Sequence, residues 1–168
     1  MISKGYTLWL MPKDKIYTKF AQLIKKLGAE YRGPIFEPHV TLLGDIELSE
    51  SEMIKRTKQL VQGQKTFPVI LRQIDYQDFY FRTLFVKAEI TKPLQDLHNL
   101  AKQIFEKNIP PYMPHLSLLY GNYPVDLKEK IIKEIGKDQT AQFEISSVHL
   151  VRGGEVEDWK IIKEFTFS

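Results

Sequence analysis

One seven-residue pattern occurs twice in the chain, and each copy is built around a histidine. The first copy, PHVTLLG, begins at Pro38, and the second, PHLSLLY, begins at Pro114. The chain has four histidines, so this pattern holds half of them. His115 follows His39 by 76 positions, and the same offset relates other segments of the two halves. The pattern therefore indicates one internal duplication, which limits the fold more than any single element does.

Both halves repeat one predicted order of elements, strand–helix–strand–helix–strand. Short apolar runs bounded by Gly or Pro predict strands, and apolar residues at helical spacing predict helices. Ser49 and Glu52 have the spacing of a capping box at the start of a helix that runs to about Val61. The other predicted elements are strands at 5–11, 39–43, 67–76, 82–90, 115–120, 143–151 and 158–167, and helices at 14–28 (stopped by Gly28), 91–107 and 125–136.

No linker separates the two halves, and 168 residues fit one domain. We therefore expect a single domain over residues 1–168, with lobe-level repeats at roughly 5–76 and 82–151 and a terminal strand at 158–167. A duplicated unit of this kind predicts two lobes packed about a pseudo-two-fold axis.

Composition excludes several classes of site and location. The chain has no cysteine, which excludes a disulfide scaffold, a thiol nucleophile and a cysteine zinc site. We expect a cytoplasmic protein, since no signal peptide is visible and no run approaches the roughly 20 apolar residues of a membrane helix. The net charge of +3 favours anionic ligands slightly and does not indicate a surface for duplex nucleic acid.

The repeated pattern predicts that four polar side chains share one cleft. In a strand, residues i and i+2 face the same way. His39 and Thr41 therefore point to one face of the first lobe, and His115 and Ser117 point to the matching face of the second. If the two strands run side by side near the pseudo-two-fold axis, two imidazoles and two hydroxyls meet there.

This set of groups suits phosphoryl chemistry on a diester. A neutral histidine can deprotonate water, and a protonated one on the opposite side can donate to the leaving oxygen. The hydroxyls can donate to the non-bridging oxygens, where negative charge accumulates. In-line attack needs base and acid on opposite sides of phosphorus, which two-fold symmetry provides, and no metal is required.

Simpler readings of the histidines remain open at this point. A duplicated fold could keep similar residues for packing alone, although packing explains the Val and Leu positions better than the polar ones, which are costly to bury unpaired. A zinc site from the two motif histidines would need another ligand, and neither motif has a carboxylate at i+2 or i+4. We expect His98, in a helix near Asp96, to face solvent and His149, in a late strand, to be structural or exposed.

The doubled motif, a histidine and a Ser or Thr that alternate with apolar residues, resembles that of the 2H phosphoesterase superfamily. The surrounding segments resemble the plant and fungal cyclic phosphodiesterases within it: YTLWLMP, GPIFEPHVTLL, DFYFRTLFV and PYMPHLSLLYG. The resemblance runs in order from Tyr6 to the terminal strand that contains Trp159. It implies a bilobal α+β fold in which antiparallel sheets, with helices outside, line a central cleft. It also implies metal-independent opening of cyclic phosphates without a cofactor.

The resemblance also implies roles for particular residues. The four catalytic positions are His39, Thr41, His115 and Ser117, with His115 as the base for water and His39 as the acid for the leaving alkoxide. The implied substrate-binding residues are Tyr120, which contacts the phosphate, Phe81, which stacks on a nucleobase, and Trp9, which lines the cleft. The first motif has Gly44 where the second has Tyr120, so the tyrosine contact is expected from one side only.

The resemblance implies a small-molecule substrate and a reaction. Members of the subgroup hydrolyse ADP-ribose 1″,2″-cyclic phosphate to ADP-ribose 1″-phosphate, a step downstream of tRNA splicing, and open nucleoside 2′,3′-cyclic phosphates to 2′-phosphates. Two alternatives stay open. One is an enzyme that acts on RNA 3′ ends, as a 2′,3′-cyclic phosphodiesterase or a 2′-5′ ligase-like protein, and the other is a non-catalytic nucleotide-binding module. We expect a monomer with no membrane partner.

Overall fold

One antiparallel sheet of eight strands runs through the whole molecule, in the order β6-β3-β4-β5-β2-β1-β7-β8. The computed structural model describes residues 1–168. The strands are β1 (Ser3–Leu10), β2 (Val40–Ile46), β3 (Phe67–Asp75), β4 (Leu84–Ala88), β5 (His115–Leu119), β6 (Asp138–Ile145), β7 (Ser147–Gly154) and β8 (Lys160–Thr166). The helices are α1 (Asp14–Tyr31), α2 (Glu50–Val61), α3 (Lys92–Ile104) and α4 (Val125–Ile135), with short 3₁₀ turns η1 (Tyr80–Arg82) and η2 (Val156–Asp158). The predicted α+β class is confirmed.

The strand order has the symmetry expected of a duplicated chain. It reads the same from both ends when β1 is exchanged with β4, β2 with β5, β3 with β7 and β6 with β8. One strand of each repeat crosses to the other half, because β3 of the first repeat pairs with β4 and β7 of the second pairs with β1. Each half of the sheet therefore contains strands from both sequence repeats, so the repeats and the halves divide the chain differently.

The two halves of the sheet meet between β2 and β5. These strands share a single paired position, Val40 with Leu116. Both side chains are fully buried. Away from this position, β2 pairs along its length with β1, and β5 pairs with β4. The two motif strands therefore touch at one point next to both histidines and then separate.

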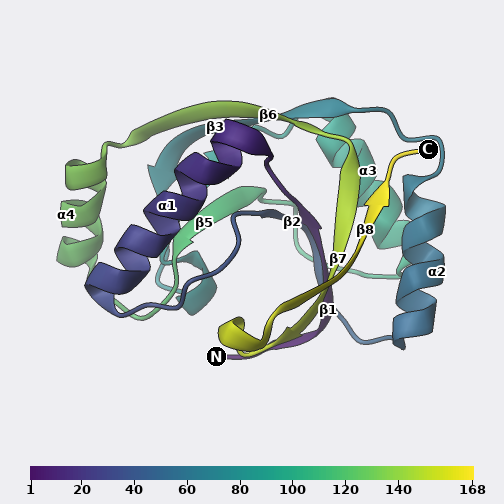
Figure 1. The fold of residues 1–168 in the computed structure, drawn as a ribbon, viewed down its shortest axis with the longest axis horizontal. Helices are drawn as coiled ribbons and strands as arrows, with labels where there is room; N and C mark the ends of the chain where they lie inside the picture. The colour runs from purple at the N-terminus through teal and green to yellow at the C-terminus, as the bar shows by residue number, and fades with distance from the viewer.

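The helices cover the outside of the sheet, and α1 and α3 each pack on the half that contains the motif strand of the other repeat. α1 packs against β5, and its symmetry mate α3 packs against β2. Figure 1 shows α1 and α4 at one end of the molecule and α2 and α3 at the other, with the curved sheet between them. A single cluster of 35 buried hydrophobic residues includes members of all eight strands. The two halves therefore share one core.

Two predicted element boundaries were wrong. The first helix continues past Gly28 to Tyr31 and ends at Arg32, which has the left-handed conformation (φ 56°). Gly28 is there for packing, since a Cβ on it would lie 3.0 Å from Cγ1 of Ile35. The strand predicted at 143–151 is two strands, β6 and β7, which break at Ser146. The start of β6 was missed because it is an edge strand of largely polar sequence, DQTAQFEI.

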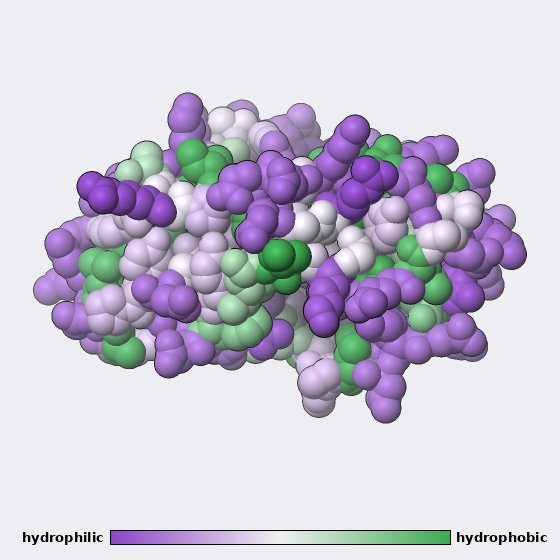
Figure 2. Space-filling model, turned by 90° about the horizontal axis from the view of Figure 1, so that it is seen from below, coloured by the Kyte–Doolittle hydropathy of each residue, from purple (hydrophilic) through white to green (hydrophobic).

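Hydrophilic side chains cover most of the face that Figure 2 shows, and hydrophobic ones gather on it in small groups. The exposed large hydrophobic residues are scattered along the chain: Met1, Ile2, Ile35, Phe79, Ile90, Val125 and Ile161. No helix has both the length and the apolar character needed to cross a membrane.

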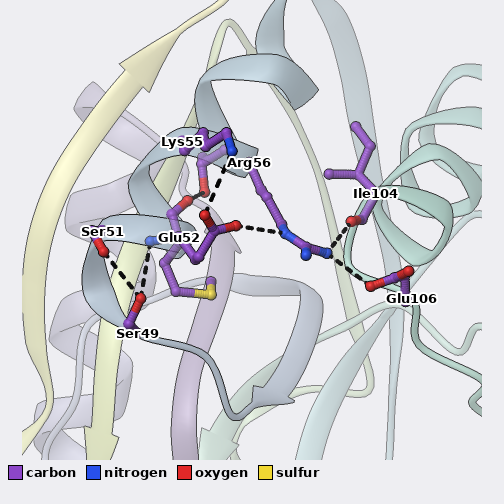
Figure 3. A network of polar contacts seen from close by, with 9 residues as sticks. Ser49, Ser51, Glu52, Lys55, Arg56, Ile104 and Glu106 are labelled. Atoms are coloured by element: carbon purple, nitrogen blue, oxygen red, sulfur yellow. Dashed lines mark hydrogen bonds and ion pairs between the residues drawn. The ribbon is translucent and has the colours of Figure 1, made fainter.

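A polar network joins α2 to the end of α3 (Figure 3). Arg56 donates to the carbonyl of Ile104 (2.7 Å) and forms ion pairs with Glu52 (3.2 Å) and Glu106 (3.2 Å). At the start of α2, the backbone N–H of Glu52 donates to the hydroxyl of Ser49 (3.3 Å), as the capping pattern predicted. The network therefore links α2 to the C-terminal end of α3.

We expect Ser49→Ala to lower the free energy of unfolding by about 1 kcal/mol, because an unpaired N–H is left at the helix start. For a chain of this size that corresponds to a fall in Tm of about 2–4 °C. Ser51→Ala, in the same turn and also exposed, is the matched control and should change Tm little. Equal Tm values for wild type and Ser49→Ala would contradict a capping role.

Candidate active site

A cleft of about 880 Å³ is lined by residues of both halves of the sheet. The four residues of the repeated motif line it, and so do the three further residues predicted to touch a substrate. They come from β1, β2, β5 and the segment around η1, which lie far apart in sequence. The seven residues are His39, Thr41, His115, Ser117, Tyr120, Phe81 and Trp9.

Strand alternation explains how the motif divides between cleft and core. Val40 and Leu116, which pair at the seam of the sheet, are fully buried in the core together with Leu118. The residues on either side of them, His39 and Thr41 in one half and His115 and Ser117 in the other, line the cleft. The seam therefore holds the two polar pairs on opposite sides of one central position.

Each motif histidine is held by a carbonyl two residues before it. Nδ1 of His39 donates to the carbonyl of Glu37 (2.7 Å), and Nδ1 of His115 donates to the carbonyl of Met113 (2.8 Å). In both loops a proline lies between, and a proline favours extended backbone in the residue before it. Because a carbonyl can only accept, Nδ1 carries the proton of each neutral ring. Nε2 is therefore the atom left for proton transfer.

An aromatic ring from the neighbouring strand lies against each imidazole. Trp9 stacks face to face on His39, with ring centroids 3.7 Å apart and planes 8° apart. Phe85, at the position 76 residues after Trp9, lies tilted against His115 at 5.0 Å. In the sheet, Trp9 pairs with Thr41 and Phe85 pairs with Ser117. The duplication thus repeats the ring supports as well as the histidines.

Burial keeps both motif histidines neutral. It lowers the pKa of His39 to about 3, although the bond to the Glu37 carbonyl acts in the opposite direction and nearby His115 adds to the lowering. Burial also lowers the pKa of His115, and the charge of Arg82 adds to this effect. Negative charge beside an imidazole favours its protonated form. The site therefore holds two proton acceptors until an anion enters.

Hydroxyl groups complete the centre of the cleft. Ser117 donates to the carbonyl of Phe81 (3.2 Å), so an incoming phosphate oxygen would compete for this proton. Tyr120 is 3% exposed and stacks on Phe36 at 3.9 Å. Burial raises the pKa of the Tyr120 phenol, so the group stays a donor at neutral pH.

The tyrosine also marks where the symmetry breaks. The matching position in the first motif is Gly44, and a Cβ there would meet only Thr41 and Thr7 at ordinary contact distances of 3.7–3.9 Å. The cleft is therefore open on the Gly44 side, where the second half presents a phenol.

His98 was wrongly predicted to face solvent. It is 1% exposed and lines the cleft. Its Nδ1 donates to the carbonyl of Leu42 (2.8 Å), and its ring stacks on Tyr112 at 3.8 Å. Tyr112 in turn donates to the carbonyl of Thr41 (2.8 Å). His98 and Tyr112 thus bind two β2 carbonyls at positions where β5 no longer pairs with β2. The burial of His98 could have been predicted from helical spacing, since it lies four residues after buried Leu94.

Sequence reasoning did not place Trp159 in the site. It lines the cleft just before β8 and lies 6.0 Å from Phe81, with the ring planes 27° apart. It also meets Trp9 edge to face at 5.5 Å. The chain has two tryptophans, and both line this cleft. The rarity of tryptophan could have suggested a role for Trp159. Its direction could not be predicted, because it follows a polar turn and belongs to no periodic pattern.

The structure brings together no three histidine, aspartate or glutamate side chains in an arrangement that could hold a metal ion. The zinc alternative would need such a third ligand beside His39 and His115. Carboxylates line the cleft only at Asp45 and Glu47, on the Gly44 side.

A family model described as cyclic phosphodiesterase-like protein matches residues 4–167. The chain belongs to this family. It is thus a 2H phosphoesterase of the cyclic phosphodiesterase group, as the doubled motif predicted. A cyclic phosphodiesterase of Arabidopsis thaliana is 29% identical over 125 residues, which cover 74% of this chain and 69% of that protein. A 2′,3′-cyclic-nucleotide 3′-phosphodiesterase of Kluyveromyces lactis is 24% identical and covers 96% of this chain and 98% of its own length.

Solved structures support the fold of this family member. The crystal structure of TT0787 of Thermus thermophilus matches with a TM-score of 0.67 at 17% identity, over 97% of each chain. The structure of E. coli LigT complexed with 3′-AMP matches with a TM-score of 0.65 at 12% identity, over 99% of each chain. The α+β fold that the resemblance to 2H phosphoesterases implied is confirmed.

In the free protein, we expect the His39 side chain to stay neutral, with the proton on Nδ1, from about pH 8 down to about pH 5. Its pKa lies below the ordinary value of about 6.5 because burial disfavours the charged ring. Side-chain ¹⁵N NMR over this range checks both the charge and the tautomer, and His39→Gln assigns the signal. Titration of His39 near pH 6.5 would contradict the buried, neutral state.

Proposed function

We propose that the enzyme hydrolyses ADP-ribose 1″,2″-cyclic phosphate to ADP-ribose 1″-phosphate and nucleoside 2′,3′-cyclic phosphates to 2′-phosphates, without a metal ion. One observation carries this proposal. Two neutral imidazoles, each with Nδ1 bound to a carbonyl and Nε2 left for proton transfer, line one cleft from opposite sides of the sheet seam. The names of the relatives from A. thaliana and K. lactis support the substrate class.

In the proposed reaction, water attacks phosphorus from the His115 side. Nε2 of His115 takes a proton from this water as the new P–O bond forms. On the other side, the bond from phosphorus to one ribose oxygen breaks, and Nε2 of His39 gives its proton to that oxygen. The leaving oxygen is O3′ in a nucleoside 2′,3′-cyclic phosphate and O2″ in ADP-ribose 1″,2″-cyclic phosphate. Thr41, Ser117 and Tyr120 donate to the non-bridging oxygens as charge builds up there.

His39 has to be protonated to act as the acid, and the charge of the bound substrate favours this protonation. Burial leaves this ring neutral in the free enzyme. A bound cyclic phosphate places a negative charge beside His39 and so raises the pKa of this ring, whereas the charge of Arg82 acts against protonation of His115, the base. Stacking on Trp9 favours the charged ring further, because a cation over an indole face is stabilised. Binding and protonation are therefore coupled.

The rest of a nucleotide would lie against the aromatic side of the cleft. Phe81 and Trp159 present nearby rings with planes 27° apart, and Tyr120 meets Phe81 edge to face at 5.3 Å. Aromatic faces of this kind bind nucleobases by stacking. We assign base contact to Phe81 and, with it, Trp159.

We expect His39→Ala and His115→Ala each to lower kcat by at least about a hundredfold, because each removes a proton-transfer group. The assay follows turnover of both cyclic phosphates in EDTA by chromatography, and Tm reports folding. His149→Ala is the matched control, since His149 pairs with Trp9 in the sheet but does not line the cleft. Near-wild-type turnover by either motif variant, or loss of wild-type activity in EDTA, would overturn the mechanism.

The same assay distinguishes the proposed function from the main alternative, an enzyme that acts on RNA 3′ ends. A short RNA that ends in a 2′,3′-cyclic phosphate serves as a third substrate at several salt concentrations. Turnover of the RNA alone, with a steep loss as salt rises, would assign the site to RNA 3′ ends. Efficient turnover of the two small substrates with little dependence on salt supports the proposed function.

A further inference from the structure

Arg82 is a cation in the cleft that the proposed reaction does not use. It closes the 3₁₀ turn that carries Phe81, and its side chain lines the cleft beside Phe79. Two backbone bonds fix this turn. The N–H of Arg82 donates to the carbonyl of Phe79 (2.9 Å), and the N–H of Gln77 donates to the carbonyl of Arg82 (2.9 Å). The guanidinium therefore starts from a defined backbone position.

No carboxylate neutralises this guanidinium. Arg56, Arg72 and Arg152 each form an ion pair with a glutamate, whereas Arg82 forms none. Its side chain has one polar contact, to Oε1 of Gln77 at 3.4 Å. The two carboxylates that line the cleft lie on the Gly44 side, where Lys4 and Lys107 also lie. An anion that reached Arg82 would therefore meet an unpaired positive charge.

The guanidinium lies towards the rim of the cleft. It is placed over the ring of Phe79 at 5.6 Å, and Phe79 is 47% exposed. The charge of Arg82 also lowers the pKa of His115, near the centre of the cleft. Arg82 is thus close to the reaction centre but lies to one side of it.

The duplication does not repeat this residue. The position 76 residues before Arg82 is Tyr6, whose hydroxyl donates to Glu50 (3.2 Å). The histidines and hydroxyls of the two motifs come in symmetrical pairs, whereas Arg82, like Tyr120, is found on one side only. Because Arg82 lies over Phe79 and outside the paired groups of the reaction centre, it can bind a part of the substrate other than the reacting phosphate.

We propose that Arg82 binds a second, non-reacting phosphate, attached to the 5-carbon of the ribose whose cyclic phosphate is opened. This inference rests on the proposed function and names the substrate class more narrowly. A planar guanidinium can donate two parallel N–H bonds to two phosphate oxygens, which makes arginine well suited to this contact. Arg82 is then a specificity-determining residue, which favours phosphorylated nucleotides over simple nucleoside cyclic phosphates.

The test compares two substrates that differ by one phosphate: adenosine 2′,3′-cyclic phosphate and the same nucleoside with an added 5′-phosphate. The measured quantity is the ratio of their kcat/KM values. We expect wild type to prefer the 5′-phosphorylated substrate, and Arg82→Gln to reduce this preference by about 10- to 100-fold. Arg82→Lys should restore only part of it, because lysine keeps the charge but not the paired donors. The ratio cancels any change in His115, which acts on both substrates alike.

Arg72→Gln is the matched control for the loss of one positive charge, since Arg72 pairs with Glu89 and does not line the cleft. It should leave the ratio unchanged. An unchanged ratio in Arg82→Gln, or an equal loss on both substrates, would overturn the proposal, because Arg82 would then act on the reaction centre or not at all.

A binding measurement tests the role of Arg82 independently of whether the proposed hydrolysis occurs. Calorimetry compares adenosine 2′-phosphate with adenosine 2′,5′-bisphosphate, and neither ligand needs to be turned over. Tighter binding of the bisphosphate by wild type, lost in Arg82→Gln, supports the inference even if no cyclic phosphate is hydrolysed. Equal binding of both ligands by wild type overturns it even if hydrolysis is observed.

Two kinds of substrate carry a phosphate at this carbon. To distinguish them, the kcat/KM of wild type and Arg82→Gln is also measured on one substrate of each kind. ADP-ribose 1″,2″-cyclic phosphate has a diphosphate there, and a dinucleotide that ends in a 2′,3′-cyclic phosphate has a phosphodiester. The substrate with the larger loss in Arg82→Gln identifies the source of the second phosphate. A loss on neither substrate would overturn the proposal.

Discussion

The structure depends on one contact between strands, the pair Val40–Leu116. It joins the two halves of the sheet, and it lies directly between the polar residues of both motifs. Because side chains alternate along a strand, burying these two residues in the core turns their neighbours, including both histidines, into the cleft. The strands separate beyond the pair, and Tyr112 and His98 then bind the β2 carbonyls that β5 no longer faces.

Two opposing influences act on the protonation of the motif histidines: burial and the charge of a bound anion. Removing an imidazole from water disfavours its charge, and the backbone carbonyl on Nδ1 recovers only part of that loss. An empty site therefore contains two neutral rings that repel no anion and hold fixed orientations. In the proposed reaction, the charge of an entering phosphate acts against this effect and favours protonation of His39.

The surroundings of the site are less symmetrical than its centre. Histidines, hydroxyls and ring supports follow the duplication closely, which suits a reaction with attack and departure on opposite sides of one atom. Around them the halves differ: Tyr120 stands opposite Gly44, and Arg82 stands opposite Tyr6. The proposed substrates are symmetrical only near their cyclic phosphate, so differences between the halves at these positions can change specificity while the two histidines stay the same.

The sequence by itself determined whatever depends on neighbours along the chain. The repeat offset, the alternation of the motif strands, the cap at Ser49 and most helix and strand positions could all be predicted, because periodicity and turn chemistry are local. The tertiary structure decided what depends on the surface that a residue meets. Gly28 lies inside a helix because Ile35 packs over it, His98 is buried because Tyr112 and β2 cover it, and Trp159 enters the cleft because the last strands cross to the first half. No local pattern encodes such contacts, since each partner comes from a distant segment.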